Sequence, residues 1–531
     1  MDLSVIPTRR RKLKHFNTTA VCVPSLHYMV DISDTINEIA KMVDKGSYFT
    51  INRARQFGKT TTLNMLKSAL ESKYVVLSMS FESISEEGFS TEGKFVKTFS
   101  KLIVDKCEFS GLSLPSNILE GLKKIDEVTP LDELFRIIKR WIMGSDKPIV
   151  LIIDEVDSAT NNQVFIDFLA QLRDGYISRT TDGMPAFQSV ILAGVTDVKH
   201  LKGKIREDNE QKQNSPWNIA ADFNVDMSLS ESGIKAMLDE YDSDYHTNMD
   251  TAMLAGLLRD YTGGYPFLVS RICQIIDEKI SKKWNKEGFE EAVKMLLAES
   301  NTLFDSLTAK LANYPTLRNT IRGILMSGDR VTYNADQYEI SQLVMYGFIV
   351  NNHNTIAISN RIFETRLYNL FLSDEELKND AFSKEGALTK NIFVKDGKLD
   401  MPLIMEHFIK TYIQVFGPLE DRFLEKDGRE LFLLYIKPII NGTGNYYIEA
   451  QTRDQTRTDV IIDYLGQQYI IELKIWRGPR YNQEGEQQIC EYLDYFNLDT
   501  GYMLSFNFNK NKETGVKRLN VGDKVLFEGM L

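Results

Sequence analysis

Cysteine and histidine are scarce in this sequence, and the cysteines are not spaced as a metal site or a disulfide framework would require. Cys22, Cys107, Cys273 and Cys490 lie far apart and form no Cys-x-x-Cys pair, and there are six histidines. This spacing excludes a zinc ribbon or zinc finger, both of which need closely spaced ligands. We therefore expect reduced thiols in a cytosolic protein.

The sequence also lacks a hydrophobic run long enough to span a membrane. The basic cluster Arg9–Lys14 is not followed by the apolar segment of a secretory signal. We therefore expect a cytoplasmic protein with no membrane partner. The net charge of -11 argues against a chain that coats nucleic acid by bulk electrostatics, so any contact with nucleic acid must be local.

The patterning of apolar residues predicts an α/β fold in the first half of the chain. A strand, a polar loop, a helix and a second strand follow one another from Tyr48, and this βαβ order predicts a parallel sheet. Two further apolar runs read as strands buried on both faces. With 531 residues, 43% of them hydrophobic, the chain can form more than one domain. The four predicted strands cover residues 48–51, 74–81, 149–153 and 189–195.

The loop after the first strand has the end of a phosphate-binding loop without its usual beginning, because Arg53 stands where such a loop normally opens with glycine. Gly58, Lys59 and Thr60 still lie between a strand and a helix. There, backbone N–H groups and the helix N-terminus can hold phosphates, the lysine can reach the β- and γ-phosphates, and the hydroxyl can bind Mg²⁺. The predicted ATP contacts in this loop are Arg55, Gln56, Phe57, Gly58, Lys59, Thr60 and Thr61.

Asp154 and Glu155, at the end of the third strand, supply the second half of a nucleotide site. Asp154, with Thr60, would hold Mg²⁺, and Glu155 would orient the attacking water as the catalytic acid–base residue. The alternative is a Gly-Lys-Thr turn that only shapes a loop and a polar strand end that only caps a helix. Both halves occur in the right order at carboxyl ends of predicted parallel strands, where ligands bind, so we predict an ATPase.

Four segments, FNTTAVCVPSLHYMVD, YFTINRARQFGKTTTLNML, LIIDEVD and TGGYPFLVSRICQ, together resemble the bacterial AAA-like ATPases of the STAND-related group. The resemblance covers about the first 280 residues. It implies that a loop of the RARQ form binds nucleotide without the leading glycine. It also implies that Thr196 is a sensor close to the γ-phosphate, that the segment His27–Asp31 lies near the adenine, and that Gly264-Tyr265-Pro266 joins a helical lid to the nucleotide.

Several of these residues have simpler roles open to them. His27 could be a packed core histidine, the glycines before Tyr265 a helix boundary, and Arg271, a possible second sensor, a helix-surface arginine. Arg53 or Arg55 could take the transition-state charge or form an ion pair with an acidic neighbour. The sequence does not choose between these alternatives, nor does it show whether a neighbouring subunit in a homo-oligomer supplies an arginine.

A second set of residues near the carboxyl terminus has the composition of a metal-dependent nuclease site. Asp459 begins a predicted strand, and Glu472 and Lys474 share one face of the next because side chains alternate. Gln488 and Tyr492 share a face of the following helix. The two carboxylates can bind Mg²⁺ or Mn²⁺, which polarises a phosphodiester and activates water, while Lys474 stabilises developing charge.

The Glu-Leu-Lys and Gln-x-x-x-Tyr elements resemble the PD-(D/E)XK nuclease superfamily, in its RecB-like branch, over about the last 110 residues. The resemblance implies catalytic roles for Lys474, Gln488 and Tyr492. Glu430 could be a further acidic ligand, and Asp463 is the alternative to Asp459. An isolated Glu-x-Lys on a strand is more often a solvent-facing pair.

These observations predict an ATP-binding and ATP-hydrolysing protein that controls a nuclease acting on nucleic acid, with DNA as the expected substrate. The alternative is a STAND-like signalling or scaffolding ATPase whose nuclease-like domain binds a partner or nucleic acid without cleaving it. The expected fold is α/β. The expected domains are a P-loop ATPase core at 1–225, a helical lid at 226–300, a winged-helix-like region at 301–376, a helical linker at 377–420 and a PD-(D/E)XK-like domain at 421–531.

Overall fold

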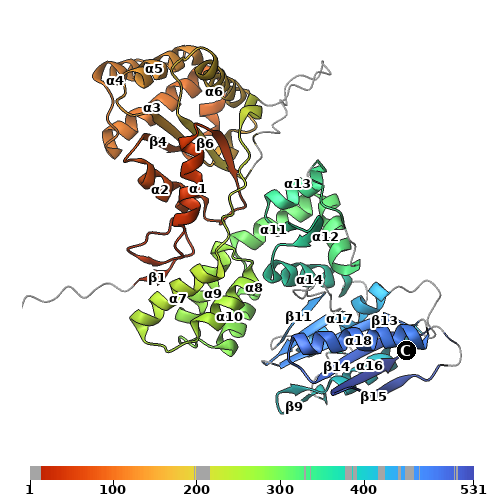
Figure 1. Ribbon diagram of the computed structural model, residues 1–531. Coiled ribbons are helices and arrows are strands. Elements are labelled where there is room, and N and C mark those ends of the chain that lie inside the picture. The colour runs from red at the N-terminus through yellow and green to blue at the C-terminus, as the bar shows by residue number, and fades with distance from the viewer. Residues whose placement is uncertain are drawn as a thin grey trace, which may run out of the picture. The chain divides into compact units, whose positions relative to one another are not determined.

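The chain divides into two compact units, each described below by itself (Figure 1). The first consists of Met1–Tyr245, Gly264–Ser270 and Gln342–Gly347, and the second of His246–Gly263, Arg271–Ser341 and Phe348–Leu531. The computed structural model describes residues 14–195, 198, 216–327, 331–334, 336–376, 386, 392–416, 425–440, 444–448, 460–465, 467–476, 478–507, 509 and 512–531.

The first unit is built on a four-stranded parallel sheet with the strand order β3-β6-β5-β4. Each predicted strand of the first half is present, which confirms the α/β expectation. Strand β6 lies between β3 and β5, so its carboxyl end at Gly194 comes between the loop after β3 and Asp154 at the end of β5. The strands are β3 Tyr48–Asn52, β4 Val75–Ser80, β5 Ile149–Asp154 and β6 Ser189–Gly194.

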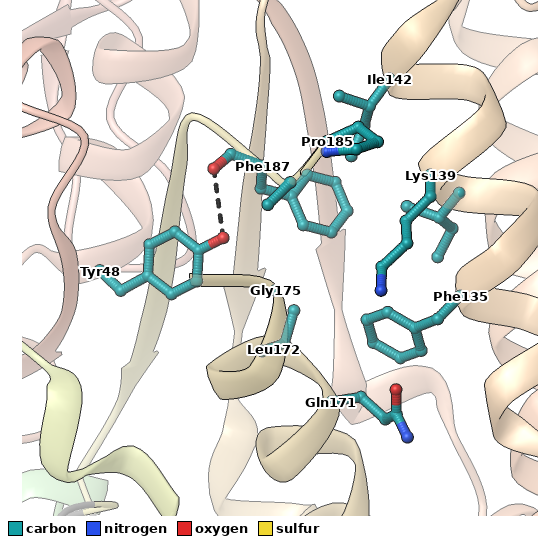
Figure 2. A pocket seen from close by; sticks show the side chains of 11 residues that line it. Tyr48, Phe135, Lys139, Ile142, Gln171, Leu172, Gly175, Pro185 and Phe187 are labelled. Carbon is teal, nitrogen blue, oxygen red and sulfur yellow. Dashed lines mark hydrogen bonds between the residues drawn. The ribbon is translucent and has the colours of Figure 1, made fainter. Parts of the chain in front are cut away.

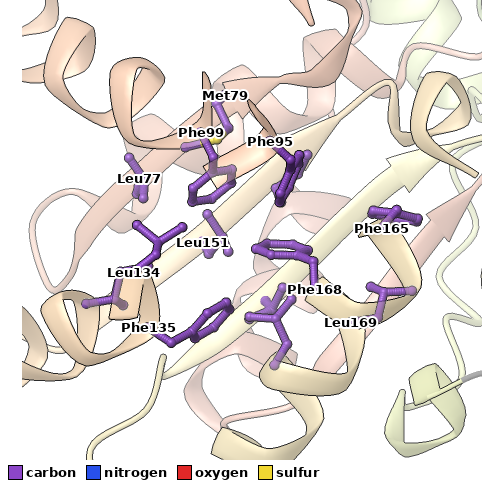
Figure 3. Packing of buried hydrophobic residues seen from close by; sticks show 14 of the residues in the cluster. Leu77, Met79, Phe95, Phe99, Leu134, Phe135, Leu151, Phe165, Phe168 and Leu169 are labelled. Atoms are coloured by element: carbon purple, nitrogen blue, oxygen red, sulfur yellow. The ribbon is translucent and has the colours of Figure 1, made fainter. Parts of the chain in front are cut away.

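Both faces of this sheet are buried, which explains the continuous apolar runs in the sequence. Leu151 points into a core rich in phenylalanine, in which Phe168 packs against Phe95 and Phe99 at ring-centroid distances of 5.5 and 5.2 Å (Figure 3). Its neighbour Val150 points to the other face, into a separate core. Each such buried side chain contributes roughly 1.5–3 kcal/mol, so the sheet is held from both sides.

Helices cover the two faces of the sheet. Residues of α1 and α2 pack on one face and residues of α3 to α6 on the other. Local sequence sets their ends: the Thr91 hydroxyl caps α3 by accepting the N–H of Lys94, and Gly111, with φ 72°, ends it. The helices are α1 Ser33–Asp44, α2 Lys59–Leu70, α3 Glu92–Ser110, α4 Ser116–Lys123, α5 Leu131–Met143, α6 Gln163–Thr181 and α7 Glu231–Tyr245.

The second unit begins with helices. Asp250 and Asn285 cap α8 and α10 with their side chains, as the preference for these residues at helix starts predicts. The antiparallel hairpin β7–β8 lies within residues 301–376, the region expected to resemble a winged helix. The elements are α8 Thr251–Thr262, α9 Pro266–Glu278, which begins in the first unit, α10 Lys286–Ala298, α11 Thr302–Asn313, α12 Pro315–Ser327, α13 Tyr338–Met345, which ends in the first unit, β7 Ile349–Asn352, β8 Thr355–Ile358 and α14 Arg361–Glu376.

The rest of the second unit is a six-stranded mixed sheet with the order β11-β12-β13-β14-β16-β15. The sequence analysis did not identify β15 and β16, a hairpin that turns at Gly522 with φ 61°. The two-residue turn Gly522-Asp523 is a hairpin signal that could have located it. The strands are β11 Gly444–Ile448, β12 Val460–Tyr464, β13 Gln467–Ile475, β14 Thr500–Phe506, β15 Gly515–Val521 and β16 Lys524–Met530.

Helices cover both faces of this sheet as well. Gly529 lies against Met405 of α16, whereas Gly501 lies against Ile489 of α18. Gly501 pairs with Leu526, three residues before Gly529, so the two glycines face opposite sides of the sheet. The face under α18 therefore carries every second residue of β13, including Glu472 and Lys474. The helices are α16 Met401–Phe416, α17 Glu425–Ile440 and α18 Pro479–Tyr495.

Two expectations about the chain as a whole concern its thiols and its helices. All four cysteines are free, and Cys273 is buried. Burial raises the pKa of the Cys273 thiol, so this residue behaves as part of the core. No helix in the described ranges has an apolar stretch long enough to cross a membrane.

Candidate active sites

The loop between β3 and α2 has the backbone shape that its sequence suggested. Gly58, with φ 80°, precedes the helix, and Gln56 adopts φ 57°, which is uncommon for a residue other than glycine. Lys59 begins α2, and its ammonium group donates to the backbone carbonyls of Arg53 and Ala54 at 3.1 Å each. The lysine thus bonds to its own loop, at the place where phosphate oxygens would compete for it.

Thr60 and Asp154 meet across the carboxyl edge of the sheet. The Thr60 hydroxyl donates to Asp154 Oδ2 at 2.8 Å, and the other carboxylate oxygen accepts the N–H of Glu155 at 2.9 Å. Asp154 is 8% exposed. A hydroxyl and a carboxylate at this separation offer the oxygen ligands that Mg²⁺ prefers, so the residues present fit such an ion.

Burial changes the acid–base properties of this site. It lowers the pKa of Lys59, and the nearby carboxylates, Glu155 first, partly oppose this by stabilising its charge. Burial also raises the pKa of Glu155, against the opposing charge of Lys59. Glu155 stands in the left-handed region at φ 53°, directly after the strand that ends at Asp154. Strained backbone and shifted pKa values often occur together at functional sites.

Arg53, which replaces the usual glycine, is held by the protein itself. Its guanidinium donates to the carbonyls of Asn52, at 2.8 Å, and Val225, at 2.7 Å, and lies 5.1 Å from the centre of the Phe223 ring. Burial lowers the pKa of Arg53. Arg55, by contrast, is exposed. The geometry therefore favours Arg55 over Arg53 as the arginine that could reach a nucleotide.

Two later segments of the first unit cover the phosphate loop. The Tyr265 hydroxyl donates to the carbonyl of Arg55, and the Tyr265 ring lies edge-on to Phe57 at 4.8 Å. A Cβ added at Gly347 would lie 3.0 Å from the Ala54 side chain. Nothing in the local sequence predicted the Gly347 contact, although a glycine between a helix and a strand is a signal for a turn.

The segment before α1 also touches the loop helix. The N–H of Cys22 donates to the hydroxyl of Thr61 at 3.1 Å. His27 is 8% exposed, and its Nδ1 accepts the N–H of Val23 at 2.8 Å. His27 is therefore a packed histidine. Its segment contacts the helix after the phosphate loop through Cys22.

The end of β6 is fixed by a residue that the sequence analysis did not single out. Asp157 accepts the N–H of Val195 at 2.8 Å, and it is among the charges that stabilise the ammonium form of Lys59. Asp157 is the third acidic residue of the sequence Asp-Glu-Val-Asp. Its closeness to the predicted phosphate site could have drawn attention to it. Thr196, the predicted sensor, follows Val195 and lies outside the described residues.

In the second unit, four of the predicted nuclease residues come together. Lys474 lies 3.4 Å from Glu472, and its ammonium donates to Gln488 Oε1 at 2.8 Å. The Gln488 amide donates in turn to the Tyr492 hydroxyl at 2.8 Å. Alternation on β13 and the i, i+4 spacing on α18 place them there.

Asp459, the predicted metal ligand, lies outside the described residues. The next residue, Val460, pairs with Ile471, which directly precedes Glu472. Within the described ranges no group of three or more histidine, cysteine or acidic residues could hold a metal ion. Glu472 is 3% exposed, and its carboxylate suits a divalent ion. Of the two predicted metal ligands, Glu472 and Asp459, the described residues include Glu472 alone.

The remaining acidic and basic candidates of the second unit have other partners. Asp463 accepts a hydrogen bond from the Tyr261 hydroxyl at 3.2 Å. Glu430 is bound by Arg322 at 3.2 Å. Arg271 forms an ion pair with Glu299, whose pKa it lowers against the effect of burial. Arg271 is therefore engaged as a helix-surface arginine.

One hollow of the first unit lies far from the phosphate loop. It is lined by Tyr48 and Phe187, at the amino-terminal starts of β3 and β6, among others, and its volume is about 10 Å³ (Figure 2). The Tyr48 hydroxyl donates to the carbonyl of Phe187 at 3.1 Å. The loop is at the opposite, carboxyl edge of the sheet, so this hollow is no part of the nucleotide site.

Comparison with protein families gives two matches. Residues 18–373 match the family described as AAA-like domain, and residues 444–519 match the PD-(D/E)XK nuclease superfamily. The chain thus carries an AAA-like domain followed by a PD-(D/E)XK nuclease superfamily domain, which confirms the AAA-like and PD-(D/E)XK resemblances at the level of these two families.

Among curated proteins, this chain is similar to an uncharacterized WD repeat-containing protein of Synechocystis sp., with 23% identity over 255 residues. That match covers 46% of this chain and 20% of the relative, so the chain spans about a fifth of the relative's length.

Among solved structures, this chain is similar to a Walker-type ATPase of Pyrococcus abyssi. The identity is 13%, the TM-score 0.47, and the match covers 66% of this chain and 99% of that one. It is also similar to the ORC1 protein of Aeropyrum pernix, solved in complex with DNA. There the identity is 12%, the TM-score 0.29, and the coverage 64% and 93%.

Proposed function

We propose that this chain, which belongs to the AAA-like domain family, is an ATPase whose nucleotide state controls a metal-dependent nuclease in its C-terminal domain. DNA is the proposed substrate, and the cytoplasm the proposed location. The observation that carries the proposal is the contact chain from Glu472 through Lys474 and Gln488 to Tyr492, in a protein whose first unit brings Thr60 to Asp154.

In the ATPase half, Lys59 exchanges the carbonyls of Arg53 and Ala54 for phosphate oxygens. The N–H groups around Gly58 bind the same phosphates, since they open a helix. Thr60 and Asp154 would hold Mg²⁺, and the bound ion would neutralise part of the phosphate charge. Glu155 accepts a proton from the attacking water.

In the nuclease half, Glu472 and Asp459 would hold Mg²⁺ or Mn²⁺, whose chemistry when bound is polarisation of the phosphodiester. Lys474 offers its N–H groups to the charge that develops on the phosphate oxygens. Gln488 holds Lys474 in place, and Tyr492 holds Gln488. These contacts keep the lysine in one position before substrate arrives.

The segments between the two sites would carry the signal. We propose that the nucleotide state is transmitted through the lid at residues 226–300, the winged-helix-like region at 301–376 and the linker at 377–420. Among the described residues of these ranges most belong to helices, which can move as rigid bodies. An arginine from a second copy would complete the ATP site if the protein assembles as a homo-oligomer.

Cleavage of linear and circular DNA by the purified protein, with Mn²⁺ and with or without ATP, tests the proposal. We expect cleavage by the wild type and loss of cleavage in Lys474→Ala. Lys517→Ala is the matched control, since Lys517 is an exposed lysine of the same sheet that is paired with Glu513. It should cut as the wild type does.

If that cleavage depends on ATP, the nucleotide state of the first unit controls the nuclease, as proposed. Absence of cleavage under every condition, with ATP hydrolysis intact, would contradict the nuclease half. It would favour a signalling or scaffolding ATPase whose C-terminal domain binds without cutting.

A further inference from the structure

Two tyrosines at the ends of a five-residue segment make contacts in different units. Tyr261, Thr262, Gly263, Gly264 and Tyr265 join the end of α8 to the start of α9. The chain passes from the second unit to the first between the two glycines. Both tyrosine rings are buried, at 5% and 2% exposure.

Tyr265 binds the phosphate loop in the first unit. Its hydroxyl donates to the carbonyl of Arg55, and its ring packs against Phe57. Burial raises the pKa of Tyr265, so the hydroxyl keeps its proton and stays a donor. Arg55 is one residue beyond Ala54, whose carbonyl accepts from Lys59. The carbonyl that Tyr265 holds is therefore next in the chain to one that Lys59 must release to bind phosphates.

Tyr261 binds the nuclease sheet in the second unit. Its hydroxyl donates to Asp463 Oδ2 at 3.2 Å. Its ring is fixed edge-on by Phe289, at 5.0 Å, and Arg361 lies 5.4 Å from the ring centre. Asp463 belongs to β12, which pairs with the strand that carries Glu472 and Lys474.

Asp463 depends on this hydroxyl more than an exposed carboxylate would. It is 6% exposed, and its Oδ1 accepts no hydrogen bond from any described residue. Asp260 and Glu290 lie near enough for Asp463 to raise their pKa values, in addition to the effect of burial. A buried carboxylate among like charges loses much of its stabilisation if its donor leaves.

The segment between the tyrosines leaves little slack. Gly263 and Gly264 both stand in the left-handed region, at φ 60° and 74°. A Cβ at Gly263 would lie 2.7 Å from the carbonyl oxygen of Ser359, so only glycine fits there. The two tyrosines are thus separated by only three residues, of which Gly263 is fixed by its packing.

We propose that Tyr261 and Tyr265 are positioning residues that couple the phosphate loop to strand β12, and so carry the nucleotide state to the nuclease site. This inference rests on the proposed function and names the route of its control. The coupling is reciprocal, so substrate bound at the nuclease site changes ATP affinity by the same factor as ATP changes substrate affinity.

Hydrogen–deuterium exchange of the full chain, with and without a non-hydrolysable ATP analogue, tests the route directly. In the wild type we expect the analogue to protect residues 53–61 and to change the exchange of 460–465. In Tyr261→Phe, which keeps the ring and removes the hydroxyl, residues 53–61 should still be protected while 460–465 no longer respond. Tyr74→Phe is the matched control, because it removes another tyrosine hydroxyl that donates to an aspartate, Asp44.

A conservative pair at Asp463 separates coupling from stability. Asp463→Asn keeps an acceptor oxygen for Tyr261 and should keep the response of 460–465, whereas Asp463→Ala should lose it. In the cleavage assay, the change on adding ATP should be at least about fivefold in the wild type and absent in Tyr261→Phe. Tyr265→Phe should weaken the ATP response and shift KM for ATP, which Tyr261→Phe should leave unchanged.

The outcomes distinguish this inference from the proposed function. If 53–61 are protected and 460–465 respond equally in the wild type and in Tyr261→Phe, the coupling through the tyrosines is wrong, and the ATPase proposal stands. The same holds if 460–465 do not respond in the wild type. If the analogue protects nothing in the wild type, the ATPase proposal fails and the coupling falls with it.

Discussion

Lys59 in the first unit and Lys474 in the second both serve candidate sites for phosphate chemistry, yet different partners hold them. Lys59 bonds to two backbone carbonyls of its own loop, whereas Lys474 bonds to side chains on a strand and a helix, Glu472 and Gln488. The loop must change its contacts before Lys59 can bind phosphate, so nucleotide shapes that site. The nuclease residues are placed in advance by one another.

The largest effect that tests this difference is expected at Lys59. Lys59→Ala should lower ATP turnover by about 1,000-fold, because a buried cation facing the phosphates is lost. Nucleotide-free cleavage should not change, since Lys474 and its partners belong to the other unit. Phosphate release measures the first and DNA cleavage the second.

Lys67→Ala, on the same helix, is the control for that substitution, because Lys67 pairs on the surface with Glu71. Near-normal turnover in Lys59→Ala would show that phosphates bind elsewhere. Loss of nucleotide-free cleavage would show that the two sites are not separable.

A smaller loss is expected at Glu155, and it separates binding from chemistry in the ATP site. Glu155→Gln should slow hydrolysis by about 100-fold while ATP binding is kept, since the amide cannot take a proton from water. Calorimetric binding of ATP beside a turnover assay checks both. Glu86→Gln, an exposed change, should behave as the wild type, and unaltered turnover in Glu155→Gln would mean that another residue activates water.

The preformed character of the nuclease residues is tested at Gln488. Gln488→Ala should reduce cleavage by about 10- to 100-fold, as removal of an orienting partner does at other catalytic sites. Lys474 would lose the oxygen that holds it, and Tyr492 the amide that donates to it. Gln487→Ala, the exposed neighbour, is the control. Equal cleavage by both variants would mean that the contact chain has no part in positioning.

The smallest effect on catalysis is expected at Arg53. Arg53→Met should change ATP turnover by less than about threefold, and lower the free energy of unfolding by about 1–2 kcal/mol, since it loses hydrogen bonds to carbonyls and a cation–π contact. Urea denaturation and turnover are measured on the same sample. A loss of turnover as large as that of Glu155→Gln would instead make Arg53 the residue that takes the transition-state charge.

Much of both sites could be predicted from local sequence. Continuous apolar runs identified the buried strands, and their carboxyl ends located Asp154 and the loop with Lys59. Alternation along β13 and helical spacing along α18 were enough to bring Lys474 to Gln488. In each case the rule depends on neighbours within a few residues.

The contacts between distant segments could not be predicted in this way. Gly347 packs on Ala54, and Tyr261 reaches Asp463, through tertiary packing that leaves no periodic trace in the sequence. Lys59 was expected to face phosphates, and its bonds to its own loop follow from burying an ammonium group that needs acceptors. Strands β15 and β16 were missed because no residue of β15 is buried and Lys517, Arg518 and Asn520 are exposed, so its apolar pattern is weak.

The contact of Gly347 with the phosphate loop also orders events during synthesis. The first unit includes Tyr265 and Gly347, which leave the ribosome after the helices α1 to α7 are complete. At about 5–20 residues per second, and with N-terminal parts folding first, the growing chain holds a folded sheet before these residues exist. For those seconds the loop lacks the contacts of Tyr265 and Gly347, so we expect a nascent chain to present its phosphate loop more openly than the finished protein does.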